Sequence, residues 1–174
     1  MDNVIELEDV DGLGAGAIGE PGERAFYIQA DKADARLTVL VEKEQVALLA
    51  AEAVVFLDRL ADDYPEEPLE PLQSDTADVT EPAIPLFRAR MIGLGFEPES
   101  ARVLIELREH AQDDEEEESE PDDSEGFVAR IFATRAQVRA MAANGAQAVA
   151  SGRPLCQLCN FPMDPEGHIC PRWN

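Results

Sequence analysis

The sequence predicts an α+β fold in which an antiparallel sheet packs against two helices, with a zinc-binding knuckle at the C-terminus. Three observations indicate this. Short apolar runs follow one another as paired strands do, two longer stretches carry apolar residues at helical spacing, and all three cysteines lie in the last nineteen residues. A length of 174 residues suits one domain with an appended module. We therefore expect an α+β domain over residues 1–152 and a zinc-binding knuckle over 153–174 that packs on it.

The first half of the chain predicts strands that lead into a long helix. Strands are expected over Val4–Leu7, Ala25–Ala30 and Leu37–Val41, because each run is short and rich in β-branched or aromatic residues. The polar segment Asp31–Asp34 joins the last two into a hairpin. Glu42–Leu60 is the strongest helix, since its apolar residues recur at steps of three and four. That apolar stripe comprises Val46, Leu49, Ala53, Phe56 and Leu60.

A glycine-rich segment before the predicted hairpin matches the formal pattern G-x-G-x-x-G through Gly14, Gly16 and Gly19. In a dinucleotide-binding fold the third glycine opens a helix whose N-terminus meets the pyrophosphate. Here the turn-forming residues Glu20–Glu23 follow, and then a strand. We therefore interpret the match as accidental and the segment as a glycine turn.

The second half of the chain predicts a similar run of elements. A strand is expected over Leu86–Ile92, a glycine-rich turn over Gly93–Glu99, and further strands over Ala101–Arg108 and Phe127–Phe132. A second helix follows Thr134, because the sequence Thr-x-x-Gln at this point has the form of a capping box. Its expected core-facing residues are Val138, Met141, Ala142, Gly145 and Val149. Gly152 and Pro154 then end it.

Short sequence matches suggest that the chain contains two related halves. Glu20-Pro21 resembles Glu97-Pro98 ahead of a strand, and Gln45-Val46 in the first helix resembles Gln137-Val138 in the second. Each half then has the order glycine turn, strand, strand, helix. Matches this short also arise by chance, so two pseudo-repeated β-β-α halves and a coincidence are both open at this point.

The formal net charge of −23 is concentrated in two segments. Asp62–Glu81 holds eight acidic residues and Asp113–Glu125 holds ten, and neither contains a Lys or Arg. Their composition predicts solvated acidic loops, placed at 62–84 and 112–125. This excess of acid disfavours nucleic-acid binding, which needs a basic surface. The sequence shows no apolar run long enough to span a membrane and no signal peptide, and its cysteines are expected to be reduced. These features predict a cytoplasmic protein.

The cysteines and one histidine form a candidate zinc site of four ligands: Cys156, Cys159, His168 and Cys170. The Cys-x2-Cys turn folds two thiolates to one side of an ion, and thiolate and imidazole are the donors that zinc prefers. His168 and Cys170 are two residues apart, so their side chains point the same way on an extended segment. An odd number of cysteines disfavours a disulfide framework.

Two further features of this segment support a structural zinc knuckle. Asn160 follows the first turn, where a left-handed backbone is often required and asparagine tolerates it. Pro165–Gly167 supplies the chain reversal before the second pair of ligands. Four protein ligands close the coordination sphere, whereas catalytic zinc keeps a position open for water. We therefore expect a structural zinc ion.

Two classes of function are compatible with the sequence. No catalytic residue is identified: His110 is interpreted as a solvated loop residue, and nucleophile and P-loop motifs are absent. This favours a zinc-stabilised interaction protein with protein partners over an enzyme. The alternative is an enzyme or ligand-binding protein that acts on a phosphorylated small molecule through an arginine-lined pocket. Its candidate anion-binding residues are Arg24, Arg88 and Arg90; Arg24 could equally pair with Glu20 or Glu23.

The chain also resembles an uncharacterised actinobacterial family that is catalogued as a domain of unknown function. The resemblance is carried by Gly16–Arg24, Phe26–Ala30, Glu42–Val46 and, most specifically, the Cys-x2-Cys pair with Asp164–Arg172. It extends from about residue 14 to the end of the chain, without the acidic insert Asp113–Glu125. Members tend to be encoded beside histidine-phosphatase-like and phosphatidylinositol-kinase-like proteins, which implies a shared pathway. The resemblance implies no catalytic residues.

Overall fold

The computed structural model of the chain describes residues 3–65, 77–110, 126–164 and 166–173. Within them it has ten elements, which follow one another as two runs of four strands and a helix. The first run is β1 Val4–Leu7, β2 Gly12–Ile18, β3 Ala25–Lys32, β4 Ala35–Val41 and α1 Lys43–Asp63. The second run is β5 Phe87–Arg88, β6 Met91–Glu97, β7 Arg102–Arg108, β8 Val128–Ala133 and α2 Arg135–Ala150.

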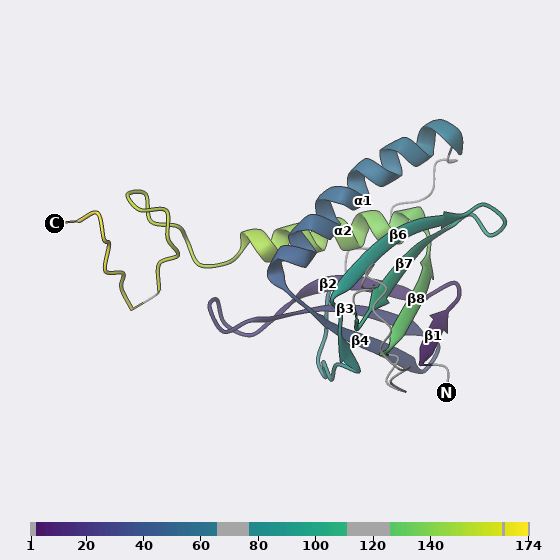
Figure 1. The fold of residues 1–174 in the computed structure, drawn as a ribbon, viewed down its shortest axis with the longest axis horizontal. Helices are drawn as coiled ribbons and strands as arrows, with labels where there is room; N and C mark the ends of the chain where they lie inside the picture. The colour runs from purple at the N-terminus through teal and green to yellow at the C-terminus, as the bar shows by residue number, and fades with distance from the viewer. Residues whose placement is uncertain (1–2, 66–76, 111–125, 165, 174) are drawn as a thin grey trace, which may run out of the picture.

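The strands form two four-stranded sheets, with the orders β1-β8-β7-β6 and β2-β3-β4-β5. The α+β class is thus confirmed, with two sheets in place of the single sheet expected. Each sheet is mixed: β1 is parallel to β8 and β5 is parallel to β4, while the other neighbours are antiparallel. The two helices pack against each other beside the sheets (Figure 1).

The first strand of each run belongs to the sheet of the other run. Between Val10 and Asp11 the chain leaves one sheet for the other, since the Val10 amide donates to Phe132 of β8 and the Asp11 amide donates to Asp31 of β3. The same change of sheet occurs between Ala89, whose amide donates to Leu40 of β4, and Arg90. The two halves therefore exchange their first strands.

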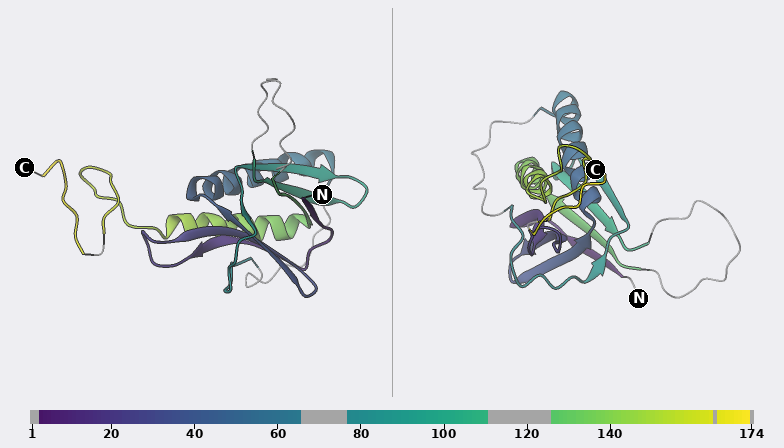
Figure 2. Two further views of the ribbon diagram at one scale, coloured as in Figure 1. Left: turned by 60° about the horizontal axis from the view of Figure 1, so that its bottom comes forward. Right: turned by 90° about the vertical axis from the view of Figure 1, so that its left-hand side faces the viewer.

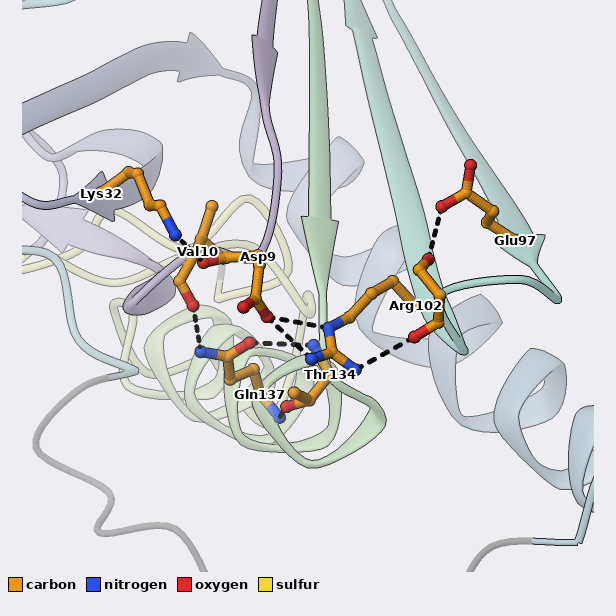
Figure 3. Close-up of polar contacts among 8 residues, drawn as sticks. Asp9, Val10, Lys32, Glu97, Arg102, Thr134 and Gln137 are labelled. Carbon is orange, nitrogen blue, oxygen red and sulfur yellow. Dashed lines mark hydrogen bonds and ion pairs between the residues drawn. The ribbon is translucent and has the colours of Figure 1, made fainter.

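The hydrogen bonds at the starts of the two helices also correspond between the two halves. In α1, Gln45 Oε1 accepts from the Glu42 amide and Gln45 Nε2 donates to the carbonyl of Ala89, at 2.8 and 3.2 Å. In α2, Gln137 Oε1 accepts from the Thr134 amide and Nε2 donates to the carbonyl of Val10, at 2.9 and 2.8 Å (Figure 3). Each glutamine caps its own helix and holds the sheet-changing segment of the other half. The two pseudo-repeated halves are present, and each is a β-β-β-β-α unit.

Both glycine-rich segments are strands, which corrects the prediction of glycine turns. β2 contains Gly14 and Gly16, and β6 contains Gly93 and Gly95. Each segment pairs along its length with the next strand, so ladder hydrogen bonds outweigh the low strand preference of glycine. At Gly14 a Cβ would lie 2.6 Å from the carbonyl oxygen of Asp78, so this glycine admits a close backbone approach rather than a nucleotide.

The strand expected over Leu86–Ile92 is divided between two elements. Phe87–Arg88 is β5, and Met91 already belongs to β6 in the other sheet. The intervening Ala89 and Arg90 carry the change of sheet, so the two ends of the expected strand diverge. This separation places neighbouring residues of the sequence on different parts of the surface.

The two helices bring their predicted apolar stripes into one core with both sheets. Gly145 of α2 lies where the helices meet: a Cβ there would be 3.0 Å from Val46 Cγ1 of α1 and 3.4 Å from Ala15 Cβ of β2. Of the stripe predicted for α1, Val46, Leu49, Ala53 and Leu60 are buried. Phe56 is only half-buried, and its neighbour Leu57 is buried instead. The left panel of Figure 2 shows α2 along the sheet that contains β2.

The two predicted acidic loops are described only in part. α1 continues through Asp63, three residues beyond the predicted end at Leu60, and Ala77 and Val79 are buried. Residues 66–76 and 111–125 lie outside the described residues, so the acidic insert Asp113–Glu125 stays a prediction. None of the helices in the described ranges combines the length and apolar content required to cross a membrane.

Candidate metal centre

The Cys-x2-Cys turn is built by local backbone hydrogen bonds in the segment that follows α2. The Cys156 amide donates to the carbonyl of Phe161 and the Asn160 amide donates to the carbonyl of Cys156, both at 2.8 Å. Leu155 and Pro162 face each other as an antiparallel bridge. Asn160 has a φ of 63°, which confirms the predicted left-handed position. These contacts fold Cys159 back beside Cys156.

A second turn returns the chain to the first. Asp164 and Gly167 form an antiparallel bridge, and the Gly167 amide donates to the carbonyl of Asp164 at 3.1 Å. Gly167 has a φ of 128°, a conformation that glycine adopts without a side-chain clash. Pro165, which is part of the predicted reversal, lies outside the described residues. His168 and Cys170 follow this turn directly.

The four predicted ligands converge on one point. Their donor atoms all lie within 4.8 Å of one another. The sulfurs of Cys156 and Cys170 are 3.9 Å apart, and Cys159 Sγ is 3.1 Å from His168 Nε2. In a tetrahedral site with Zn–S bonds of about 2.3 Å, two sulfurs lie roughly 3.8 Å apart. The group is therefore close enough to hold a metal ion.

The protonation of the thiols also suits metal binding. Backbone N–H groups of Cys159 and Leu158 point at Cys156 and lower the pKa of its thiol to about 6. This thiol is a thiolate at neutral pH, the form that binds metals. Burial raises the pKa of Cys159 above its usual value, so this thiol would have to release its proton to bind a metal ion. All three cysteines are free of disulfides.

The C-terminal segment extends past the end of α2, away from the sheets (Figure 1). Arg153 ties it together, since its Nη1 donates to Asp164 Oδ1 at 2.7 Å. Its side chain also lies against Gly22 of the β2–β3 hairpin, 3.2 Å from the position of a Cβ there. Five large apolar residues of the segment are exposed: Leu155, Leu158, Phe161, Ile169 and Trp173.

The three arginines predicted to bind an anion fall into two places. Arg24 and Arg88 line one pocket, together with Lys43 and Arg153, which sequence reasoning missed. Arg90 lines a separate groove between α1 and β6, because the change of sheet separates it from Arg88. Lys43 is the first residue of a helix and Arg153 follows another, so no sequence spacing indicated that they meet. His110 is exposed just beyond β7.

The fold and the Cys/His group together define an α+β protein of two strand-exchanged halves with a site that can hold a metal ion. The chain belongs to the family described as "Protein of unknown function (DUF3090)", whose model matches residues 5–170. The match includes both halves and all four residues of the candidate metal centre. Comparisons with curated proteins and with solved structures gave no match.

Proposed function

We propose that the protein is a zinc-stabilised interaction protein whose C-terminal knuckle presents an apolar surface to a protein partner. The donor set supports zinc, since three thiolates and one imidazole form one of its usual structural sites. All four positions are filled by the protein, so the ion serves to hold the segment rather than to activate water. The ion binds the folded segment, so the free energy of metal binding stabilises the two turns.

The observation that carries this proposal is the exposure of large apolar side chains on the metal-held segment. Ile169 is 96% exposed and Trp173 is 78% exposed, and each lies within three residues of a candidate ligand. Aromatic and large aliphatic residues that a rigid scaffold holds in water are typical of partner-binding surfaces. Following the resemblance described above, we propose kinase-like or phosphatase-like proteins as the partners.

The metal is tested first, by elemental analysis of protein purified without chelators. We expect one zinc per chain, and the variants Cys156→Ser and His168→Ala should each lose it. Less than about 0.2 equivalents of any metal, on a site expected to bind with about 10–16 kcal/mol, would contradict the metal centre.

The partner surface is tested with the full zinc-loaded chain as bait in extract from its native host. A captured protein is purified, and its binding is measured again with the double variant Phe161→Asp, Trp173→Asp. We expect a loss of at least about tenfold in affinity, since buried aromatic anchors dominate such interfaces. Leu48→Asp is the matched control: Leu48 is 63% exposed but lies on α1. Unchanged binding of the double variant, with zinc retained, would show that the knuckle is not the partner surface.

A further inference from the structure

The pocket lined by Arg24 and Arg88 lies where the C-terminal segment leaves the α+β body. It has a volume of about 400 Å³ and lies among the start of β3, the end of β4, the start of α1, β5 and the segment after α2. Its lining side chains carry four positive charges and one negative charge, in a chain whose formal net charge is −23. The charged lining residues are Arg24, Glu42, Lys43, Arg88 and Arg153.

Two of these cations, Lys43 and Arg24, lie close to the backbone of Gly152, which has no side chain. A Cβ on Gly152 would lie 3.0 Å from Lys43 Nζ and 3.2 Å from Arg24 Nη2. The fold thus holds an ammonium and a guanidinium against one glycine, although like charges repel. The negative end of the α2 dipole offsets part of this repulsion, since Gly152 directly follows the C-cap Ser151, and an anion between the two cations would offset it further.

The cations are only partly neutralised by the protein. Arg24 donates to two uncharged acceptors, the carbonyl of Ala148 at 2.9 Å and Ser151 Oγ at 3.3 Å. The side chain of Lys43 has no hydrogen bond or ion pair among the residues that the structure describes. Arg88 pairs with Glu42 at 3.2 Å and Arg153 pairs with Asp164 at 2.7 Å, so carboxylates neutralise these two of the four cations. Within the described ranges, Arg24 and Lys43 therefore have no carboxylate partner.

The corresponding helix start in the other half also carries a cation, but there the cation is buried and hydrogen-bonded. Arg135 is the first residue of α2, as Lys43 is of α1. Arg135 is 7% exposed, donates to the carbonyl of Tyr64 at 2.6 Å and lies 5.2 Å from the Phe96 ring. The positive charge of Arg135 is thus stabilised by a backbone carbonyl at the C-terminal end of α1. Lys43 meets the end of α2 in the corresponding way but makes no such bond.

We propose that this pocket binds the phosphate of a phosphate monoester. Arg24 and Lys43 would hold the phosphate from two sides, and the N-terminus of α1 adds a favourable dipole. Leu155 and Pro162, which are both exposed, form an apolar wall on which the organic part of the ligand can lie, whereas Phe26 is buried beneath the Arg24 guanidinium. The strongly negative chain is repelled by an anionic membrane surface, which favours a soluble monoester over a lipid headgroup.

The test is isothermal titration calorimetry of the zinc-loaded full chain with phenyl phosphate and with inorganic phosphate. We expect one saturable site that prefers phenyl phosphate, because of the apolar wall. Lys43→Glu should weaken binding by at least about tenfold, as expected for a charge-assisted contact. An acidic residue in the first helical turn stabilises a helix, so this variant should fold, which circular dichroism checks.

Arg59→Glu is the matched control, since it makes the same change of net charge on the same helix but lines the other groove. Its affinity should stay within about twofold of the wild type, because surface charges remote from the ligand are screened by salt. Absence of saturable phosphate binding, or equal weakening by both variants, would overturn the proposal. Co-flotation with vesicles that contain phosphatidic acid distinguishes the sources. Lys43-dependent flotation would assign the phosphate to a lipid, and its absence alongside calorimetric binding would assign it to a soluble monoester.

Discussion

At the centre of the β7–β8 pair, the carboxylate of Glu106 accepts hydrogen bonds from two arginines. Arg108 Nε donates to one oxygen at 2.6 Å and Arg130 Nε donates to the other at 2.9 Å. Glu106 and Arg130 are register partners on adjacent strands, and the Glu106 side chain is 21% exposed. Partial burial alone would raise the pKa of Glu106, but the hydrogen bonds and charges of Arg130 and Arg108 outweigh it and lower the pKa.

We expect Glu106→Gln to lower the free energy of unfolding by about 1–2 kcal/mol at pH 7, because charge-assisted hydrogen bonds are lost. A lowered folded-state pKa means that this stabilisation is complete above the unfolded-state pKa of about 4.3. It is lost as the pH falls through the folded-state value. Urea denaturation from pH 7 to pH 3 measures the difference, which should shrink below about pH 4.

Glu99→Gln serves as the control for this prediction, since Glu99 is exposed in the turn between β6 and β7. Its stability should match that of the wild type at every pH. A Glu106→Gln variant as stable as the wild type at pH 7 would show that the two arginines are equally well solvated without the carboxylate.

Among the elements, the C-terminal segment differs from the others in what holds it. The helices and sheets share one apolar core, whereas this segment exposes most of its large apolar side chains and is closed by short turns. We therefore expect its order to depend on a bound metal ion, and that of the α+β body to be independent of it. Trp173 is 78% exposed, so its fluorescence is already that of a solvated side chain and reports little of metal loss.

Replacing Cys159 with Ser should release the metal and leave the two sheets and both helices intact. Hydrogen exchange should become fast in residues 155–170, whose backbone bonds lie within the two turns, and should be unchanged in α2 and β8. Mass spectrometry of deuterium uptake measures both regions in one experiment. Global loss of protection would mean that the knuckle is integral to the core, and retained metal would exclude Cys159 as a ligand.

On the scale of the whole molecule, the exchange of β1 and β5 makes the two halves interdependent. Neither sheet is complete without a strand from the other half, and the capping glutamines Gln45 and Gln137 bond to the carbonyls of Ala89 and Val10 across the exchange. The helices also bury their apolar stripes against each other and across the halves. The two halves thus share both sheets and one apolar core.

We therefore expect residues 1–84 and 85–174, produced separately, to lack cooperative unfolding, because each loses a strand and half of the shared core. Co-expressed, the two pieces should associate and recover a sigmoidal denaturation curve. Circular dichroism in urea measures both cases. A stable, cooperatively folded 1–84 would show that the first half forms its own core and that the exchange contributes little.

Elements whose signals are local were predictable from the residues alone. Spacings of a few residues predict the stripe of α1, the capping box at Thr134, the β3–β4 and β7–β8 strands and the four candidate metal ligands. Features that depend on contacts between distant residues were not predictable in this way. The glycine segments became strands because neighbours paired with them, and β1 and β5 changed sheets because bonds from the other half hold them. Arg24, Lys43, Arg88 and Arg153 converge from four distant points of the chain, and no local pattern encodes such a meeting.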